Sequence, residues 1–254
     1  MTDIFIYTLQ RGGNSYIINW VLNNLSHNNI SKFKRWHWGK YGEGSFSKEY
    51  GIIHARNDHN MFESKDPNGR KVVTYTHGPA VKYTVISIEN AELDKVYPYI
   101  IKNRDQKRKI INIIVLRDIA NLLASRQECD GALDDPKAPV EVKPLYLSFC
   151  NEILNKTNIL DHKVVILYNK HITDKKYRDE IARKLDIKNY DLIKVINNTT
   201  KHSSFNHVGS YNKRYLNFSY NEKYKTILKD SKIIDYTKEL FDIDVTQEIL
   251  LNRI

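Results

Sequence analysis

Short apolar runs rich in β-branched residues alternate along the chain with longer segments of helical periodicity. The runs predict buried strands at Ile4–Tyr7, Val72–Tyr75, Thr84–Ile88, Ile110–Leu116 and Lys163–Tyr168. The periodic segments predict helices at Ser15–Leu25, Ile119–Gln127, Lys143–Leu154, Lys175–Leu185, Asn221–Leu228 and Tyr236–Phe241. Buried strands that alternate with helices are typical of an α/β fold around a mainly parallel central sheet flanked by helices. We therefore predict this architecture.

Two segments show neither an apolar strand run nor helical periodicity, and we predict that they form long loops. Ser31–Arg70 is irregular and rich in glycine, aromatic and charged residues, and the stretch from Asp130 to Pro144 contains three prolines. Loops of this length in a compact domain often border a binding site. We expect acceptor-side loops at about residues 31–70 and 130–144. No linker divides the chain, so we predict one domain over residues 1–254.

The charge of the chain favours anionic partners. Its 254 residues carry a formal net charge of +10 and give a sequence pI near 9.3. Nucleic acid, an acidic glycan or a phosphorylated cofactor would suit this balance. The lysines are dispersed, which favours a solvated basic surface over a nucleic-acid arm. With no signal peptide or membrane-length apolar run, and two cysteines outside any metal-ligand spacing, we expect a cytoplasmic location without a membrane span.

The strongest chemical motif is Gln10-Arg11-Gly12-Gly13-Asn14-Ser15-Tyr16, between the first predicted strand and the first predicted helix. A strand that turns through glycines into a helix N-terminus points backbone N–H groups at an anion, and the helix dipole adds to the attraction. Arg11 adds a positive charge, while Asn14 and Ser15 add hydrogen-bond donors. The motif is neither G-x-x-x-x-G-K-[ST] nor G-x-G-x-x-G. The alternative is an ordinary strand–helix turn with a solvated arginine.

Further polar motifs follow other predicted elements. Arg117 ends the strand Ile110–Leu116, and Ser125 follows about two helical turns later, so the two side chains are candidates to share a phosphate. The alternative is a surface arginine and an unrelated serine. His77, in Tyr75-Thr76-His77, is a candidate general base. Weaker candidates for a nucleotide site are Ser203, Ser204 and Phe205, followed by Lys213 and Arg214.

Taken together and in this order, the motifs resemble those of the sulfotransferases that use 3′-phosphoadenosine 5′-phosphosulfate (PAPS), over about Ile4 to Leu216. The glycine loop is similar to the family's 5′-phosphosulfate loop. Arg117 and Ser125 match, in type and spacing, the family's residues for the 3′-phosphate. Thr76-His77 matches the end of its Lys-Thr-His motif, and Ser203-Ser204-Phe205 is similar to its adenine-side motif. The predicted strand that ends at Tyr168 looks like a strand of the family that ends in a tyrosine.

The chain departs from the family pattern at several positions. Gln10 replaces the loop proline, Asn14 the first loop threonine, Ile119 the proline after Arg-Asp, and Tyr75 the lysine before Thr-His. The late Arg-Lys-Gly motif is not evident, and Lys213 or Arg214 are candidates to replace it.

The resemblance implies a P-loop-like sulfotransferase architecture and the transfer of a sulfuryl group from PAPS, leaving 3′-phosphoadenosine 5′-phosphate (PAP). The acceptor would be a hydroxyl or an amine, on a carbohydrate or a small molecule. His77 would take the acceptor's proton, and Arg11 with the loop N–H groups of Gly12, Gly13, Asn14 and Ser15 would stabilise the departing phosphate. Arg117 and Ser125 would hold the 3′-phosphate. Tyr16, Tyr168 and Phe205 would flank the adenine, and no metal would be required.

Two other functions remain open from the sequence. One is a non-catalytic basic module that binds nucleic acid or an acidic glycan, and the positive net charge supports it. The other is a P-loop-like kinase, which would need a loop Lys-Ser/Thr that is absent here. A metal site at Asp58, His59 and Glu63 is disfavoured, because His54 and His59 are five residues apart and miss the spacing of a helical zinc pair.

Overall fold

The computed structural model describes residues 2–25, 45–46, 50–56, 64–65, 71–72, 83–104, 106–129, 142–188 and 219–245. Within these residues, a six-stranded sheet has the order β2-β3-β6-β1-β7-β8. Every neighbouring pair except the antiparallel pair β2 and β3 is parallel. The strands are β1 (Thr2–Thr8), β2 (Ser45–Phe46), β3 (Tyr50–Arg56), β6 (Tyr83–Glu89), β7 (Lys109–Leu116) and β8 (Lys163–Leu167). The predicted α/β fold with a mainly parallel sheet is confirmed.

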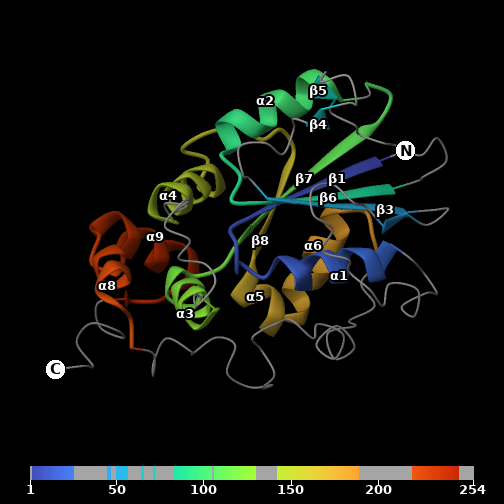
Figure 1. Cartoon of the computed structure of the whole chain (residues 1–254). Helices are drawn as coiled ribbons and strands as arrows, with labels where there is room; N and C mark the ends of the chain where they lie inside the picture. The colour runs from blue at the N-terminus through green and yellow to red at the C-terminus, as the bar shows by residue number, and fades with distance from the viewer. Residues whose placement is uncertain are drawn as a thin grey trace.

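Helices cover both faces of the sheet, as the continuous apolar strands require. Figure 1 shows α2 on one side of the sheet, and α1 and α6 on the other. Along β1, Ile4 and Ile6 belong to one hydrophobic cluster, whereas Phe5 and Tyr7 belong to the cluster on the other face. The first cluster packs against α1 (Asn14–Leu25), α5 (Tyr168–Thr173) and α6 (Lys175–Lys184). The second packs against α2 (Leu93–Asn103), α3 (Ile119–Cys129), α4 (Val142–Ile153), α8 (Glu222–Leu228) and α9 (Ser231–Phe241).

The expected strand Val72–Tyr75 is not part of the central sheet where the structure describes it. Lys71–Val72 forms β5, which pairs antiparallel with β4 (Ser64–Lys65) in a separate two-stranded sheet. Residues 73–75 lie outside the described residues. The prediction was wrong about the sheet because β-branched composition favours a strand but carries no information about its partner.

The segment Ser31–Arg70 is not irregular throughout, because β3 runs through it and pairs with β6. Gly51 and His54 interrupt the apolar pattern of this strand, which hid it from the sequence analysis. The expected loop at 130–144 ends earlier than predicted, because α4 begins at Val142 and takes Pro144 into its first turn, where proline is tolerated. Helix α2 was also missed, although Leu93, Val96, Tyr97 and Ile100 form a buried stripe of helical spacing.

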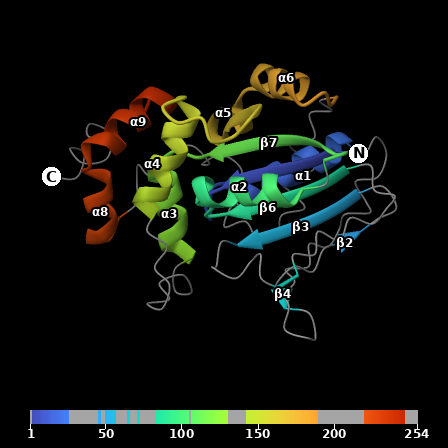
Figure 2. The same ribbon diagram turned by 90° about the horizontal axis from the view of Figure 1, so that it is seen from above.

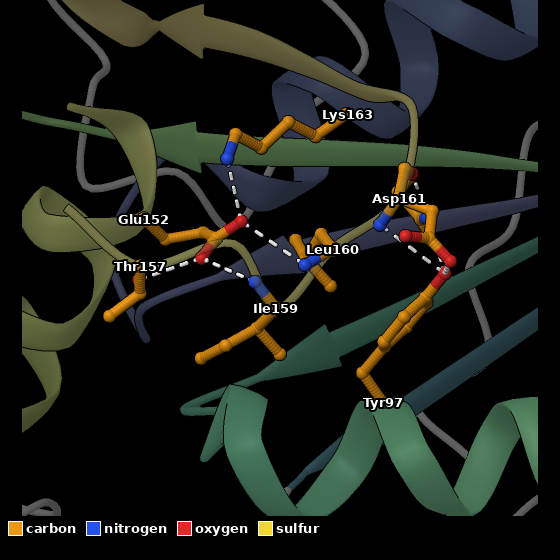
Figure 3. A network of polar contacts seen from close by, with 8 residues as sticks. Tyr97, Glu152, Thr157, Ile159, Leu160, Asp161 and Lys163 are labelled. Carbon is orange, nitrogen blue, oxygen red and sulfur yellow. Dashed lines mark hydrogen bonds and ion pairs between the residues drawn. The ribbon is translucent and has the colours of Figure 1, made fainter. Parts of the chain in front are cut away.

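The amino-terminal edge of the sheet holds closed polar networks. Arg108 bonds Asp3 through Nε at 2.8 Å and through Nη2 at 2.6 Å, and both side chains are buried. Beside the start of β8, the Glu152 carboxylate accepts hydrogen bonds from the side chains of Lys163 and Thr157 at 2.7 Å each (Figure 3). It also accepts from the backbone N–H groups of residues 159 and 160. Burial by itself raises the pKa of Glu152, but these hydrogen bonds outweigh burial and lower it.

The connections that leave β1 and β7 run to opposite sides of the sheet. The chain leaves β1 toward the β3 side of the sheet, whereas it leaves β7 toward β8 on the opposite side. The arrowheads of β3, β6 and β7 point the same way in Figure 2, so their carboxyl ends share one edge. In open α/β sheets, ligands bind at this edge, at the point where the connections diverge. The residues that follow β1 and β7 therefore define the place to look for a site.

Candidate anion site at the carboxyl edge of the sheet

The loop after β1 is a tight turn that leads directly into α1. The Gly12 N–H donates to the carbonyl of Leu9 at 2.8 Å, and the Ile17 N–H donates to the carbonyl of Gly13 at 3.1 Å. Arg11 has a φ of 69° and Gly13 a φ of 95°, both in the left-handed half of the map. The predicted strand–turn–helix is therefore present, with the N-terminus of α1 at its end.

Gly13 is required by its surroundings as well as by its backbone. A Cβ atom at this position would overlap the ring of Tyr168, the first residue of α5. The Tyr168 ring therefore packs directly on the loop backbone. The ring is also 5.4 Å from the Arg117 guanidinium carbon, a cation–π distance. Tyr168 thus joins the loop after β1 to the arginine after β7.

Arg117 lies at the end of β7, as predicted, and its side chain is 1% exposed. Its Nη1 donates to the carbonyl oxygen of Arg11 at 3.3 Å. The structure therefore places the Arg117 side chain against the backbone of Arg11, and a shared role of the two arginines stays a prediction. Ser125 lies on α3 and is also buried, whereas the Arg11 side chain is half-buried.

Arg126, which the sequence analysis did not assign, holds the loop from α3. Its Nε donates to the carbonyl of Gln10 at 3.2 Å, and its Nη2 donates to Asn90 Oδ1 at 3.1 Å. Asn90 follows β6, donates its backbone N–H to the Thr8 carbonyl and accepts from the Gln10 N–H. Arg126 and Asn90 therefore fix the loop backbone from two neighbouring elements.

The buried side chain of Asn14 makes two hydrogen bonds to residues of β6. Its Oδ1 accepts from the Ser87 hydroxyl at 2.7 Å, and its Nδ2 donates to Glu89 Oε1 at 3.3 Å. Glu89 is the last residue of β6 and is buried beside the start of α1. Glu89, Asn90 and Arg126 were not among the site residues predicted from the sequence. Their signal was available, since polar residues after a predicted parallel strand mark the same edge as Arg11.

Asp118 orients the start of α3. Its carboxylate accepts from the backbone N–H of Asn121 at 2.8 Å, which caps the helix, and from the Asn169 side chain at 2.6 Å. The Asn169 Oδ1 accepts from the Asp118 N–H in return. This reciprocal pair connects the ends of β7 and β8 and fixes the strand end that carries Arg117.

Two of the three aromatic residues predicted to flank an adenine, Tyr16 and Tyr168, pack together beside the loop. Tyr16 and Tyr168 meet edge to face, with ring centroids 5.7 Å apart, and both are buried. Behind them, His171 lies edge-on to Trp20 at 4.5 Å. Burial, with a smaller contribution from the charge of Arg178, lowers the pKa of His171 to about 3. The rings therefore support the loop from inside, and their contact with an adenine stays a prediction.

Several predicted site residues lie outside the described residues: His77, Ser203, Ser204, Phe205, Lys213 and Arg214. Ser15 lies in the first turn of α1. Among the residues that the structure describes, no group of three or more His, Cys, Asp and Glu side chains is arranged to hold a metal ion. No described helix has both the length and the apolar content needed to cross a bilayer.

A cavity of about 430 Å³ lies beside this edge, between α5 and the end of α9. Its walls include Asn169, which bonds Asp118, and the apolar side chains of Leu240 and Phe241. The cavity is therefore next to the end of β8, on the far side of β7 from the glycine loop.

These features define an α/β protein whose candidate anion site lies at the divergence point of its parallel sheet. The solved structure of mouse sulfotransferase SULT7A1 complexed with PAP is similar over 97% of this chain and 84% of its own, with 16% sequence identity and a TM-score of 0.42. Neither a scan against protein-family models nor a search of curated proteins gave a match.

Proposed function

We propose that this protein binds the nucleotide sulfate donor PAPS at the loop after β1 and transfers its sulfuryl group to a hydroxyl or an amine. The observation that carries the proposal is the hydrogen bond from Arg117 to the carbonyl of Arg11. It joins the N-terminal loop of α1 to a buried arginine across the divergence point of the sheet. The sequence resemblance to sulfotransferases assigns these same two positions to the two phosphate groups of the donor.

The residues at this edge fit an anionic nucleotide by charge and by donor chemistry. An α-helix leaves its first N–H groups without an intrahelical acceptor, and its dipole favours an anion at that end. The helix α1 begins at Asn14, directly after the loop. Arg117 offers a guanidinium fork, which suits a phosphate better than a lysine does. Arg11, Arg117 and Arg126 supply three positive charges, against Glu89 and Asp118.

Each residue has a proposed role in the transfer. Arg11 and the loop N–H groups would stabilise charge on the departing 5′-phosphate, while Arg117 and Ser125 would fix the position of the 3′-phosphate. The donor, when bound, supplies the sulfuryl group. The resemblance offers His77 as the base that takes the acceptor's proton. The acceptor class that the positive charge favours is an anionic glycan or small molecule.

Thermal-shift measurements with PAP, ATP–magnesium and an oligonucleotide test this proposal. We expect stabilisation by PAP, and an Arg117→Met variant should weaken PAP binding about 10- to 100-fold, because a charge-assisted hydrogen bond contributes about 1.5–3 kcal/mol. Ser125→Ala should give a smaller loss in the same direction. Arg183→Met, which removes an exposed arginine near the end of α6, is the matched control and should bind PAP normally.

Other responses would replace the proposal. A shift with ATP–magnesium alone would favour a kinase, and a steeply salt-dependent shift with the oligonucleotide alone would favour a nucleic-acid module. PAP binding without any release of labelled sulfate from PAPS would define a binding protein that no longer transfers.

A further inference from the structure

The strand that lies beside β1, on the side away from β7, ends in a carboxylate. In the β1–β6 register, Glu89 is the partner of Thr8, the last residue of β1. Glu89 is therefore level with the start of the glycine loop. The strand that the sequence analysis associated with His77 begins in the separate β4–β5 sheet instead. Among the described strands, β6 and β7 are the two that flank β1.

Glu89 is held against the loop by contacts at its own strand end. Its Oε1 accepts from Asn14 Nδ2 at 3.3 Å, and Asn14 is fixed in turn by the Ser87 hydroxyl. The next residue, Asn90, binds the loop backbone at Gln10. The carboxylate thus has a defined position beside the first residue of α1, where an anion bound by the loop would lie.

The strand order places Glu89 and Arg117 on opposite sides of the loop. Glu89 ends β6 and Arg117 follows β7, with β1 and its loop between them. The leaving oxygen of the proposed transfer belongs to the 5′-phosphate at the loop itself, whereas Arg117 is proposed to hold the 3′-phosphate. Glu89 therefore lies beside the loop that would hold the phosphosulfate, on the side away from the arginine proposed for the 3′-phosphate.

We propose that Glu89 is the general base of the sulfuryl transfer, an inference that rests on the function proposed above. Glu89 accepts the proton of the acceptor hydroxyl as its oxygen forms the new S–O bond. The bond between sulfur and the 5′-phosphate oxygen breaks, and its electron pair stays on the phosphate beside Arg11. The charged residues on the elements around Glu89 include Arg56, its register partner at the end of β3, together with Arg11 of the loop, Arg117 after β7 and Arg126 of α3.

The test combines turnover and binding in one set of variants. Glu89→Gln keeps the side-chain shape and an oxygen for Asn14 but removes the base. Transfer to water, followed as labelled sulfate released from PAPS, should fall about 10²- to 10⁴-fold, and the acid limb of its pH profile should disappear. PAP affinity measured by calorimetry should stay within about threefold of wild type. Glu89→Asp, which retains a displaced carboxylate, should recover part of the rate and provides a second variant if Glu89→Gln folds poorly.

Ser87→Ala is the matched control, because it removes the hydrogen bond to Asn14 and leaves the carboxylate. It should change PAP affinity while leaving the acid limb of the pH profile in place. An unchanged rate in Glu89→Gln, or a rate loss matched by an equal loss of PAP affinity, would overturn the proposal and leave Glu89 as a support of the loop. A large loss in His77→Ala with normal turnover in Glu89→Gln would assign the base to His77. Failure of the wild-type protein to bind PAP would instead reject the proposed function itself.

Discussion

The two edges of the central sheet use arginine in opposite ways. At the amino edge, Arg108 beside the start of β7 bonds directly to the carboxylate of Asp3 at the start of β1. At the carboxyl edge of the same two strands, Arg117 and Arg126 donate to the backbone carbonyls of Arg11 and Gln10. A carboxylate cancels the charge of a guanidinium, whereas a carbonyl positions it and leaves its charge in place. The contacts described at the amino edge therefore pair two charges, whereas those at the carboxyl edge hold the backbone of the loop where we propose that an anion binds.

The largest effect on stability is expected at the amino edge. Arg108→Met leaves the buried Asp3 carboxylate without its guanidinium, which should lower the free energy of unfolding by about 3–5 kcal/mol. Urea unfolding at neutral pH measures this loss. Asp3→Leu/Arg108→Met, which removes both charges, should recover most of it. Weaker PAP binding by folded Arg108→Met would contradict the separate roles that we assign to the two edges.

Gly13→Ala should damage the carboxyl edge by steric overlap. The added methyl would overlap the Tyr168 ring, and the φ of 95° disfavours any side chain, so we expect a loss of about 1–3 kcal/mol in stability together with weaker PAP binding. Unfolding curves and calorimetry with PAP measure the two effects. Gly13→Ala/Tyr168→Leu should regain part of the stability because the ring is gone. Equal stability of wild type and Gly13→Ala would show that the ring does not pack on this loop.

At neutral pH the smallest effect is that of His171 beneath the loop, because its contribution to stability changes only as the pH falls. Its pKa is lowered to about 3 in the folded protein, against an ordinary value of 6.5, so the unfolded chain takes up the proton first as the pH falls. The contribution of neutral His171 is complete above pH 6.5. It is lost at about 1.4 kcal/mol per pH unit below that, down to the folded pKa. His171→Leu should flatten the stability curve between about pH 6 and pH 4, as measured by urea unfolding. Parallel curves for wild type and variant would contradict this assignment.

Much of the fold could be predicted because local pattern carries it. Most residues of the runs at Ile4–Tyr7, Thr84–Ile88 and Ile110–Leu116 are apolar and buried, on both faces of the sheet, so these runs stand out in the sequence. β3 was missed because Gly51 and His54 interrupt its pattern, although its pairing with β6 places it in the sheet. The β propensity and the hydrophobic periodicity of a segment depend on that segment alone, whereas strand pairing depends on residues far away in the chain.

The candidate site divides in the same way. The sequence by itself determined the glycine loop and the arginine after β7, because these depend on residue types next to strand ends, and the anion chemistry inferred from them stays a prediction. Only the tertiary structure decided that Arg126 and Asn90 clamp the loop, that Tyr168 packs on Gly13, and that Glu89 ends the strand beside β1. These contacts join residues from about 36 to more than 150 positions apart. Sheet order, which no local pattern specifies, brings them together.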